Sequence, residues 1–139
     1  MTATGIRASV LALAALVLAG SPALAETKSF KADLKPVAGA NSKAEGTLTA
    51  SYDTDTKKLT WQGSYRGVST YATSAGIRGP GPAKRERLVV RMRDFDSPFE
   101  GQAIVSDSQA ADLSAGKWTV VIRTAAYPKG ELGGVLQPQ

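Results

Sequence analysis

Apolar and polar residues alternate along several short segments of the chain. Residues 44–53 alternate Leu48 and Tyr52 with threonine and serine, and residues 57–67 alternate in the same way. A period of two is typical of a β-strand with one buried face. Because a polar DTDT segment separates the two, the pattern predicts a β-hairpin from about Ala44 to Tyr65.

Further segments show the same period. Residues 86–92 and 117–124 alternate clearly, and weaker alternation, in places interrupted by glycine, is found in residues 28–35, 71–78, 100–105 and 130–137. Residues 106–116 differ, because Ser106 or Ser108 can cap a helix that Gly116 would end. A short helix or helical turn is therefore expected there.

These elements predict an all-β fold, a Greek-key-like sandwich or barrel of about seven to eight antiparallel strands with one short helical turn. Alternation also predicts which side chains fill the core between the sheets. The predicted core residues are Leu48, Tyr52, Leu59, Trp61, Leu88, Val90, Trp118, Val120 and Ile122. Both tryptophans lie among apolar positions, which favours a core role over ligand stacking.

The first 25 residues have the layout of a secretory signal peptide. One cation, Arg7, precedes an apolar run, and small residues end at Ala23 and Ala25, so cleavage is expected before Glu26. The apolar run is shorter than the ~20 residues that span a bilayer. We therefore predict an exported protein, periplasmic or secreted, with no transmembrane segment in its mature chain. Residues 26–139 fit a single domain.

Composition narrows the chemistry. The chain has no cysteine and no histidine, which removes disulfides, thiol chemistry, lipid attachment through cysteine and the commonest metal ligand. Residues 26–139 contain 16 lysines and arginines against 12 aspartates and glutamates, a net charge of +4. This interspersed charge favours anionic partners at low ionic strength but does not indicate nucleic acid.

The acidic residues give no clear catalytic or metal site. Asp94 and Asp96 lie in a polar RDFDSP segment that reads as a turn, and Asp53 and Asp55 read as residues of the hairpin turn. Neither pair has the repeated spacing of a calcium loop, although carboxylates would suit that ion. No catalytic triad and no nucleotide fingerprint is present. We predict no catalytic residue, no metal and no cofactor.

A cluster of positive charge begins at Arg78, the last residue of the segment 71–78. It comprises Arg78, Lys84, Arg85, Arg87, Arg91 and Arg93, with only Glu86 among them. On a regular strand Arg85, Arg87, Arg91 and Arg93 would share one face, opposite Leu88, Val90 and Met92. Such a face could bind an anion, or it could be a solvated strand whose like charges discourage edge-to-edge aggregation.

Two regions resemble the signatures of the CHRD family, named after chordin and found in exported bacterial proteins. The first is ATSAGIRGPGP, and the second is LSAGKWTVVIRTAAYPKGELGGVL. The matching positions are Thr73, Ala75, Ile77 and Gly79, then Leu113, Gly116, Trp118, Thr124, Pro128, Gly130, Glu131, Leu132, Gly134 and Leu136. The resemblance extends over the whole chain after the signal peptide and implies a β-fold with a binding role.

The departures from the family pattern concern its three histidines. Where the family has them, this chain has Gly76, Arg78 and Arg123, which makes it a histidine-less member of bacterial type. In the family these histidines resemble a metal site of the copper-zinc dismutase kind. Arginine stays protonated and has no lone pair for a metal, so a metal role would be lost here.

Arg78 and Arg123 are therefore expected to lie close together, with Gly76 leaving space beside them. A cationic pocket formed by Arg78, Arg123, Arg87 and Arg91 would suit a carboxylate or phosphate. In the alternative, both arginines only form salt bridges with nearby acids, of which Glu131 is the obvious candidate.

The resulting functional hypothesis is a non-enzymatic binding or envelope-associated module. Its partner would be an anionic small molecule, a polysaccharide or an envelope protein. Two alternatives remain open: a metal-binding or dismutase-like sandwich whose histidine site has been lost, and a purely structural surface protein.

Overall fold

A computed structural model describes residues 26–139 of the chain. The predicted signal peptide lies outside the described residues. The elements are β1 (Thr27–Pro36), β2 (Glu45–Asp53), β3 (Lys58–Arg66), β4 (Ala72–Pro80), the 3-10 turn η2 (Pro82–Lys84), β5 (Glu86–Met92), β6 (Phe99–Ile104), α1 (Asp107–Ser114), β7 (Thr119–Thr124), β8 (Leu132–Val135) and β9 (Gln137–Pro138).

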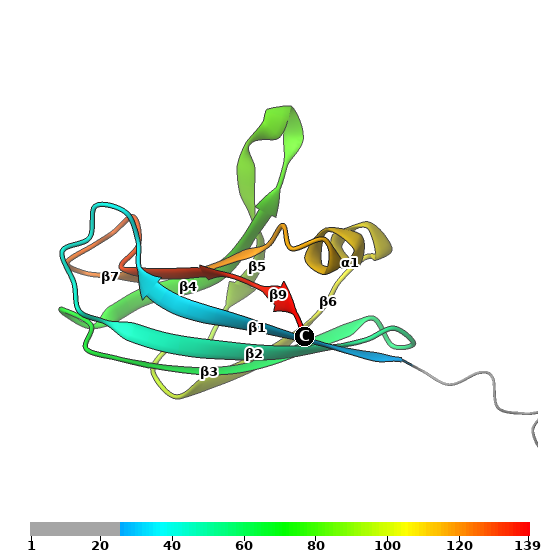
Figure 1. Cartoon of the computed structure of the whole chain (residues 1–139), viewed down its shortest axis with the longest axis horizontal. Coiled ribbons are helices and arrows are strands. Elements are labelled where there is room, and N and C mark those ends of the chain that lie inside the picture. The colour runs from blue at the N-terminus through cyan, green and yellow to red at the C-terminus, as the bar shows by residue number, and fades with distance from the viewer. Residues whose placement is uncertain (1–25) are drawn as a thin grey trace, which may run out of the picture.

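Eight antiparallel strands form one nearly closed, barrel-like sheet in the order β5-β4-β7-β8-β1-β2-β3-β6, and the short β9 pairs with β1. Figure 1 shows β1, β2 and β3 as one layer, with β4 and β7 in the layer above it. Because β8 returns to lie beside β1 of the β1-β2-β3 meander, the topology is Greek-key-like. The predicted all-β class, strand number and hairpin are confirmed.

The helical turn also forms where the capping residues predicted it. Ser106 is the N-cap of α1: its Oγ accepts a hydrogen bond from the backbone N–H of Gln109, and the Gln109 side chain accepts one from the backbone N–H of Ser106. This reciprocal capping satisfies two donors that a helix start leaves free. Gly116 follows the helix with a φ of 74°, a conformation that glycine adopts without strain.

The core is formed by the inward-facing side chains of the strands. Eight of the nine predicted core residues are buried, and both Trp61 and Trp118 are among them. Trp118 and Ile122 point to the same side, as their spacing requires. The exception is Leu88, which is 42% exposed. Alternation along the sequence placed it in the core, and this prediction is wrong.

A bulge explains the position of Leu88. Ile77 of β4 pairs with Val90, but the next residue, Arg78, pairs with Leu88, so Val89 is an extra residue on β5. An extra residue reverses the side of the sheet to which the positions beyond the bulge point, here those that precede Val89 along β5. Leu88 is therefore moved to the outer face, whereas Val89 packs partly against the core.

Among the described residues, no helix is long and apolar enough to cross a membrane.

Candidate functional site

The outer face of β4 and β7 carries the positions that the family resemblance singled out. In the β4–β7 pair, Ser74 lies opposite Arg123, Gly76 opposite Val121, and Arg78 opposite Thr119. Paired residues of antiparallel strands point to the same face. Arg78 and Arg123 therefore share the outer face, as predicted, and Gly76 and Val121 lie between them.

A third arginine, Arg91, also lies on this outer face. Gly76 pairs with Arg91, which places Arg91 on the outer face beside Arg78. Arg87 instead pairs with Gly79, whose Cβ position points toward Trp118 and the interior. The predicted common face of Arg85, Arg87, Arg91 and Arg93 is therefore wrong: the bulge separates Arg87 from Arg91.

A surface hollow of about 440 Å³ lies over this face. Four arginines line it, Arg78, Arg91, Arg93 and Arg123, and we call it the arginine hollow. Its other lining residues are Thr73, Ser74, Ala75, Gly76, Leu88, Met92, Phe95 and Val121, none of which is acidic. Of the four predicted anion-binding residues, the structure thus brings together Arg78, Arg91 and Arg123 and leaves out Arg87. Arg93 belonged to the predicted charge cluster but not to the predicted site.

The space expected beside Gly76 is occupied. A Cβ atom at this position would lie 2.5 Å from the Leu88 Cδ1 atom. Instead of open space, Gly76 has the Leu88 side chain against it, because the bulge turns Leu88 onto the outer face. Leu88 and Phe95 give the arginine hollow an apolar wall.

The arginines of the hollow have little charge compensation. Arg78 has one carboxylate nearby, with 3.7 Å between its Nε atom and Glu86 Oε2. In the part of the chain that the structure describes, Arg91, Arg93 and Arg123 form no salt bridge. Arginine stays protonated at any physiological pH, so these charges cannot be relieved by deprotonation. The hollow thus combines several permanent cations without a matching set of anions.

Glu131 was the obvious salt-bridge partner for these arginines, and the structure assigns it elsewhere. It is fully buried and accepts four hydrogen bonds. The donors are Ser42 Oγ at 2.6 Å, Thr124 Oγ1 at 2.8 Å, Ser69 N at 2.9 Å and Ser69 Oγ at 3.1 Å. Glu131 therefore ties two loops to the end of β7 and does not pair with Arg123.

The electrostatics of Glu131 follow from this arrangement. Burial raises the pKa of its carboxyl, but the hydrogen bonds from Ser42, Thr124 and Ser69 outweigh burial and bring the pKa below its ordinary value. The carboxylate is therefore ionised at neutral pH without a cationic partner. Residue spacing contained no signal for this cluster, since Ser42 and Ser69 belong to distant loops.

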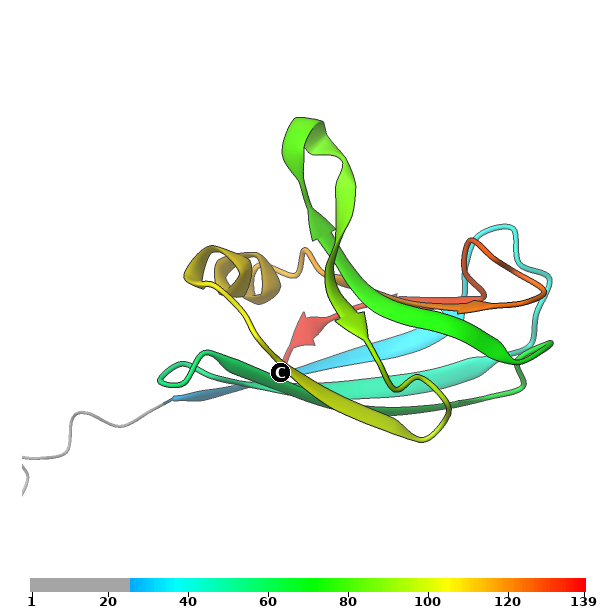
Figure 2. The same cartoon turned by 180° about the vertical axis from the view of Figure 1, so that it is seen from behind.

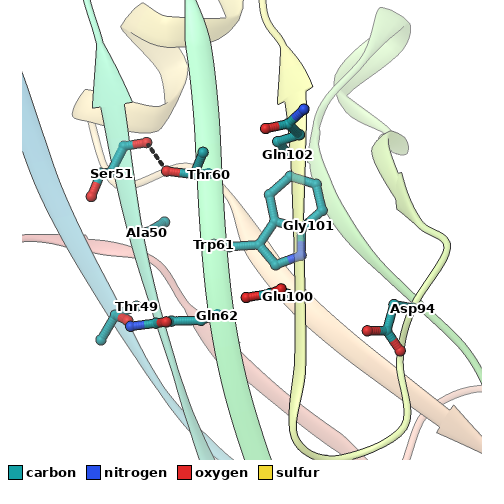
Figure 3. A pocket seen from close by; sticks show the side chains of 10 residues that line it. All are labelled: Thr49, Ala50, Ser51, Thr60, Trp61, Gln62, Asp94, Glu100, Gly101 and Gln102. Carbon is teal, nitrogen blue, oxygen red and sulfur yellow. Dashed lines mark hydrogen bonds between the residues drawn. The ribbon is translucent and has the colours of Figure 1, made fainter.

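A second hollow, lined mainly by polar side chains, lies over the outer face of β2, β3 and β6 (Figure 3). It has a volume of about 640 Å³ and includes Asp94 and Glu100. Asp94 is thus a lining residue as well as part of the turn after β5.

The acidic residues of the β2–β3 hairpin turn have a structural role. Asp53 Oδ1 accepts hydrogen bonds from the backbone N–H groups of Asp55 and Thr56, which confirms the turn role of Asp53. Across residues 26–139, no three acidic side chains gather where they could hold a metal ion.

Chemically, the arginine hollow can bind and polarise but has no group for proton transfer. Guanidinium groups donate hydrogen bonds in a planar fork that matches carboxylate and phosphate oxygens. The hydroxyls of Thr73 and Ser74 add neutral donors at one side. Thr73 Oγ1 already donates to the Arg123 backbone carbonyl at 3.3 Å, which fixes the edge of the hollow to β7.

Comparison with known proteins agrees with this fold and these motifs. No curated protein and no solved structure matches the chain. The profile of the CHRD domain family matches residues 30–136, which takes in the strands from the middle of β1 to β8 and both segments that carry Arg78 and Arg123. The chain therefore belongs to the CHRD domain family.

Proposed function

We propose that this CHRD domain is a non-enzymatic binding module and that the arginine hollow holds a small anion with carboxylate or phosphate oxygens. One observation supports the proposal above others. Four arginines line a single hollow that no acidic residue lines, and three of these arginines have no salt bridge among the described residues.

Mutual repulsion makes such a cluster costly without a ligand. Like charges repel one another most where they lie within the Debye length of ~10 Å at 0.1 M salt, because solvent ions then screen them only in part. A bound anion would offset this repulsion and accept bidentate hydrogen bonds. Because Arg91 and Arg93 are exposed and Arg78 and Arg123 are only half-buried, each contact is expected to contribute about 1 kcal/mol, and binding should be weak and sensitive to salt.

The lining of the hollow also favours binding over catalysis and over metal chemistry. Neutral-pH proton transfer usually relies on histidine or a carboxyl group, and the hollow offers guanidinium groups and hydroxyls. A protonated guanidinium has no lone pair for copper or zinc. We further propose that the domain acts outside the cytoplasm, in the periplasm or as a secreted protein, which is supported by the signal-like sequence of residues 1–25.

Calorimetric titration of phosphate and citrate at low and high salt tests this function. The Arg123→Ala variant should bind at least about fivefold more weakly, which corresponds to a loss of ~1 kcal/mol. Arg66→Ala is the matched control, because it removes the same charge from an exposed arginine that pairs with Glu45. Arg66 lies on β3, which is four strands away from β7 in the order of the sheet. Copper should show no stoichiometric binding.

Two results would contradict the proposal. In the first, Arg123→Ala and Arg66→Ala lower the phosphate affinity by the same factor. Only the net charge of the protein would then matter, which is the behaviour of a structural surface protein. Tight copper binding would restore the metal-site alternative.

A further inference from the structure

The hairpin of β4 and β5 extends beyond the barrel. Figures 1 and 2 show it rising from the body of the molecule, next to but separate from α1. We call residues 79–88 the basic arm. All its residues from Pro82 to Leu88 are exposed, as is Pro80, so most of the basic arm is free of contact with the barrel.

All of the domain's excess positive charge lies on this hairpin. Residues 72–93 contain six lysines and arginines and one acid, Glu86. The rest of the chain from residue 26 onward contains 10 lysines and arginines against 11 aspartates and glutamates. The barrel is thus close to neutral, and the hairpin carries a net charge of +5. The field of the protein should orient the basic arm toward an anionic surface.

The turn that presents these charges is held in one shape. Pro80 and Pro82 fix their own φ angles, and the backbone N–H of Arg85 donates to the Pro82 carbonyl at 3.2 Å. Ala83 and Lys84 both have left-handed backbone conformations, with φ of 58° and 60°. Non-glycine residues rarely adopt this conformation, and such residues cluster at functional positions.

The cations of the basic arm are available for a partner. Its acid, Glu86, lies next to Arg78, whereas Lys84, Arg85 and Arg87 form no salt bridge within the described part of the chain. Exposed apolar groups from Pro80, Pro82 and Leu88 lie beside these charges. The surface is therefore both cationic and partly apolar.

We propose that the basic arm docks the domain onto an anionic phospholipid bilayer. A convex projection can contact a planar surface, whereas a polymer strand or a small ligand is usually held in a groove or hollow. Near an anionic bilayer each lysine or arginine raises partitioning about fivefold, so three cations give a factor on the order of a hundred. The apolar groups beside them suit the interface between headgroups and acyl chains.

This inference shares the charge of the hairpin with the proposed anion site, because Arg78, Arg91 and Arg93 contribute to both, but it rests on different contact residues. Lys84, Arg85 and Arg87 do not line the arginine hollow, and Arg123 does not belong to the basic arm. Binding to a bilayer and binding to a soluble anion can therefore be removed separately.

Co-sedimentation with lipid vesicles tests the docking. We expect the protein to bind vesicles that contain about one third phosphatidylglycerol at low salt. It should not bind vesicles of pure phosphatidylcholine, and about 0.5 M salt should abolish binding to the anionic vesicles. The variant with Lys84→Gln, Arg85→Gln and Arg87→Gln should bind at least tenfold more weakly. Circular dichroism and a thermal melt identify any loss of folding.

A matched control separates the basic arm from net charge. Lys28→Gln, Lys43→Gln and Lys129→Gln remove the same charge from exposed sites on the barrel and its loops and should change vesicle binding by less than about threefold. Arg123→Ala should also leave vesicle binding within about threefold. Equal loss in the arm variant and the lysine control would overturn the inference. So would a wild type that ignores the anionic vesicles, or one that binds dextran sulfate but not vesicles.

Discussion

Replacing Glu131 by glutamine should destabilise the fold strongly at neutral pH. The carboxylate is fully buried and accepts four hydrogen bonds, three of them on Oε2. Hydrogen bonds to a charged group are worth ~1.5–3 kcal/mol each and those between neutral groups ~0.5–1.5 kcal/mol. Glutamine removes the charge from all four and turns one acceptor into a donor that faces Thr124.

The expected loss is about 3 kcal/mol in the free energy of unfolding. Two or three of the four bonds should each lose about 1 kcal/mol, and the donor at Thr124 adds a mismatch that hydroxyl rotation relieves in part. For a domain of this size the total stability is on the order of 10 kcal/mol, so the change is large. Urea unfolding at pH 7 measures it. Glu100→Gln is the control, because Glu100 is an exposed carboxylate and its loss should cost less than about 0.5 kcal/mol.

The pH dependence has a definite sign. The pKa of Glu131 is lower in the folded protein than its ordinary value of 4.5, so its contribution to stability is present above the unfolded pKa and is lost as the pH falls through the folded pKa. Glutamine does not titrate. The stability gap between wild type and Glu131→Gln should therefore be full at pH 7 and shrink below about pH 4.5. A gap under 0.5 kcal/mol at pH 7, or a gap that widens on acidification, would refute this reasoning.

Three further substitutions test local features of the fold by urea or thermal unfolding. Val90→Ala should cost about 2 kcal/mol, whereas Leu88→Ala should cost under about 1 kcal/mol, since the bulge leaves Val90 inside and Leu88 outside; equal costs would place Leu88 in the core after all. Ser106→Ala should cost about 1 kcal/mol through loss of the capping bond to Gln109, and no effect would mean that α1 does not depend on its cap. Gly79→Ala should cost about 1–3 kcal/mol, because its Cβ would lie 2.8 Å from the Trp118 ring, and a neutral result would show that this ring can shift.

The sequence carried most of the information on fold because alternation and turn residues are local signals. The β2–β3 hairpin, the capped helix and the burial of Trp61 and Trp118 could all be predicted within a few residues. The bulge could not, because an extra residue at Val89 leaves no mark on the alternation of its own strand. It becomes apparent only in the pairing of β5 with β4, and it changes the side to which Leu88 and Arg87 point.

The candidate site was predictable in part for the same reason. Strand parity and the family positions brought Arg78 and Arg123 to one face, and parity also placed Arg91 there. Only the exclusion of Arg87 depended on the bulge. Charge alone made Glu131 the obvious salt-bridge partner in the alternative in which both arginines only pair with acids. Its real partners, Ser42, Ser69 and Thr124, are hydroxyl residues that come together only through the closure of the barrel.

Nuclear magnetic resonance tests most directly whether the arginine hollow binds anions. Phosphate titrated into the ¹⁵N-labelled protein at low salt should shift the backbone amides of Ser74, Gly76, Arg91, Val121 and Arg123 along saturable curves. Amides of the polar face of β2, β3 and β6 should stay unchanged and serve as the internal reference. Arg123→Ala should weaken the response. Shifts spread evenly over all exposed cations, or none near Gly76 and Val121 at millimolar phosphate, would contradict the account.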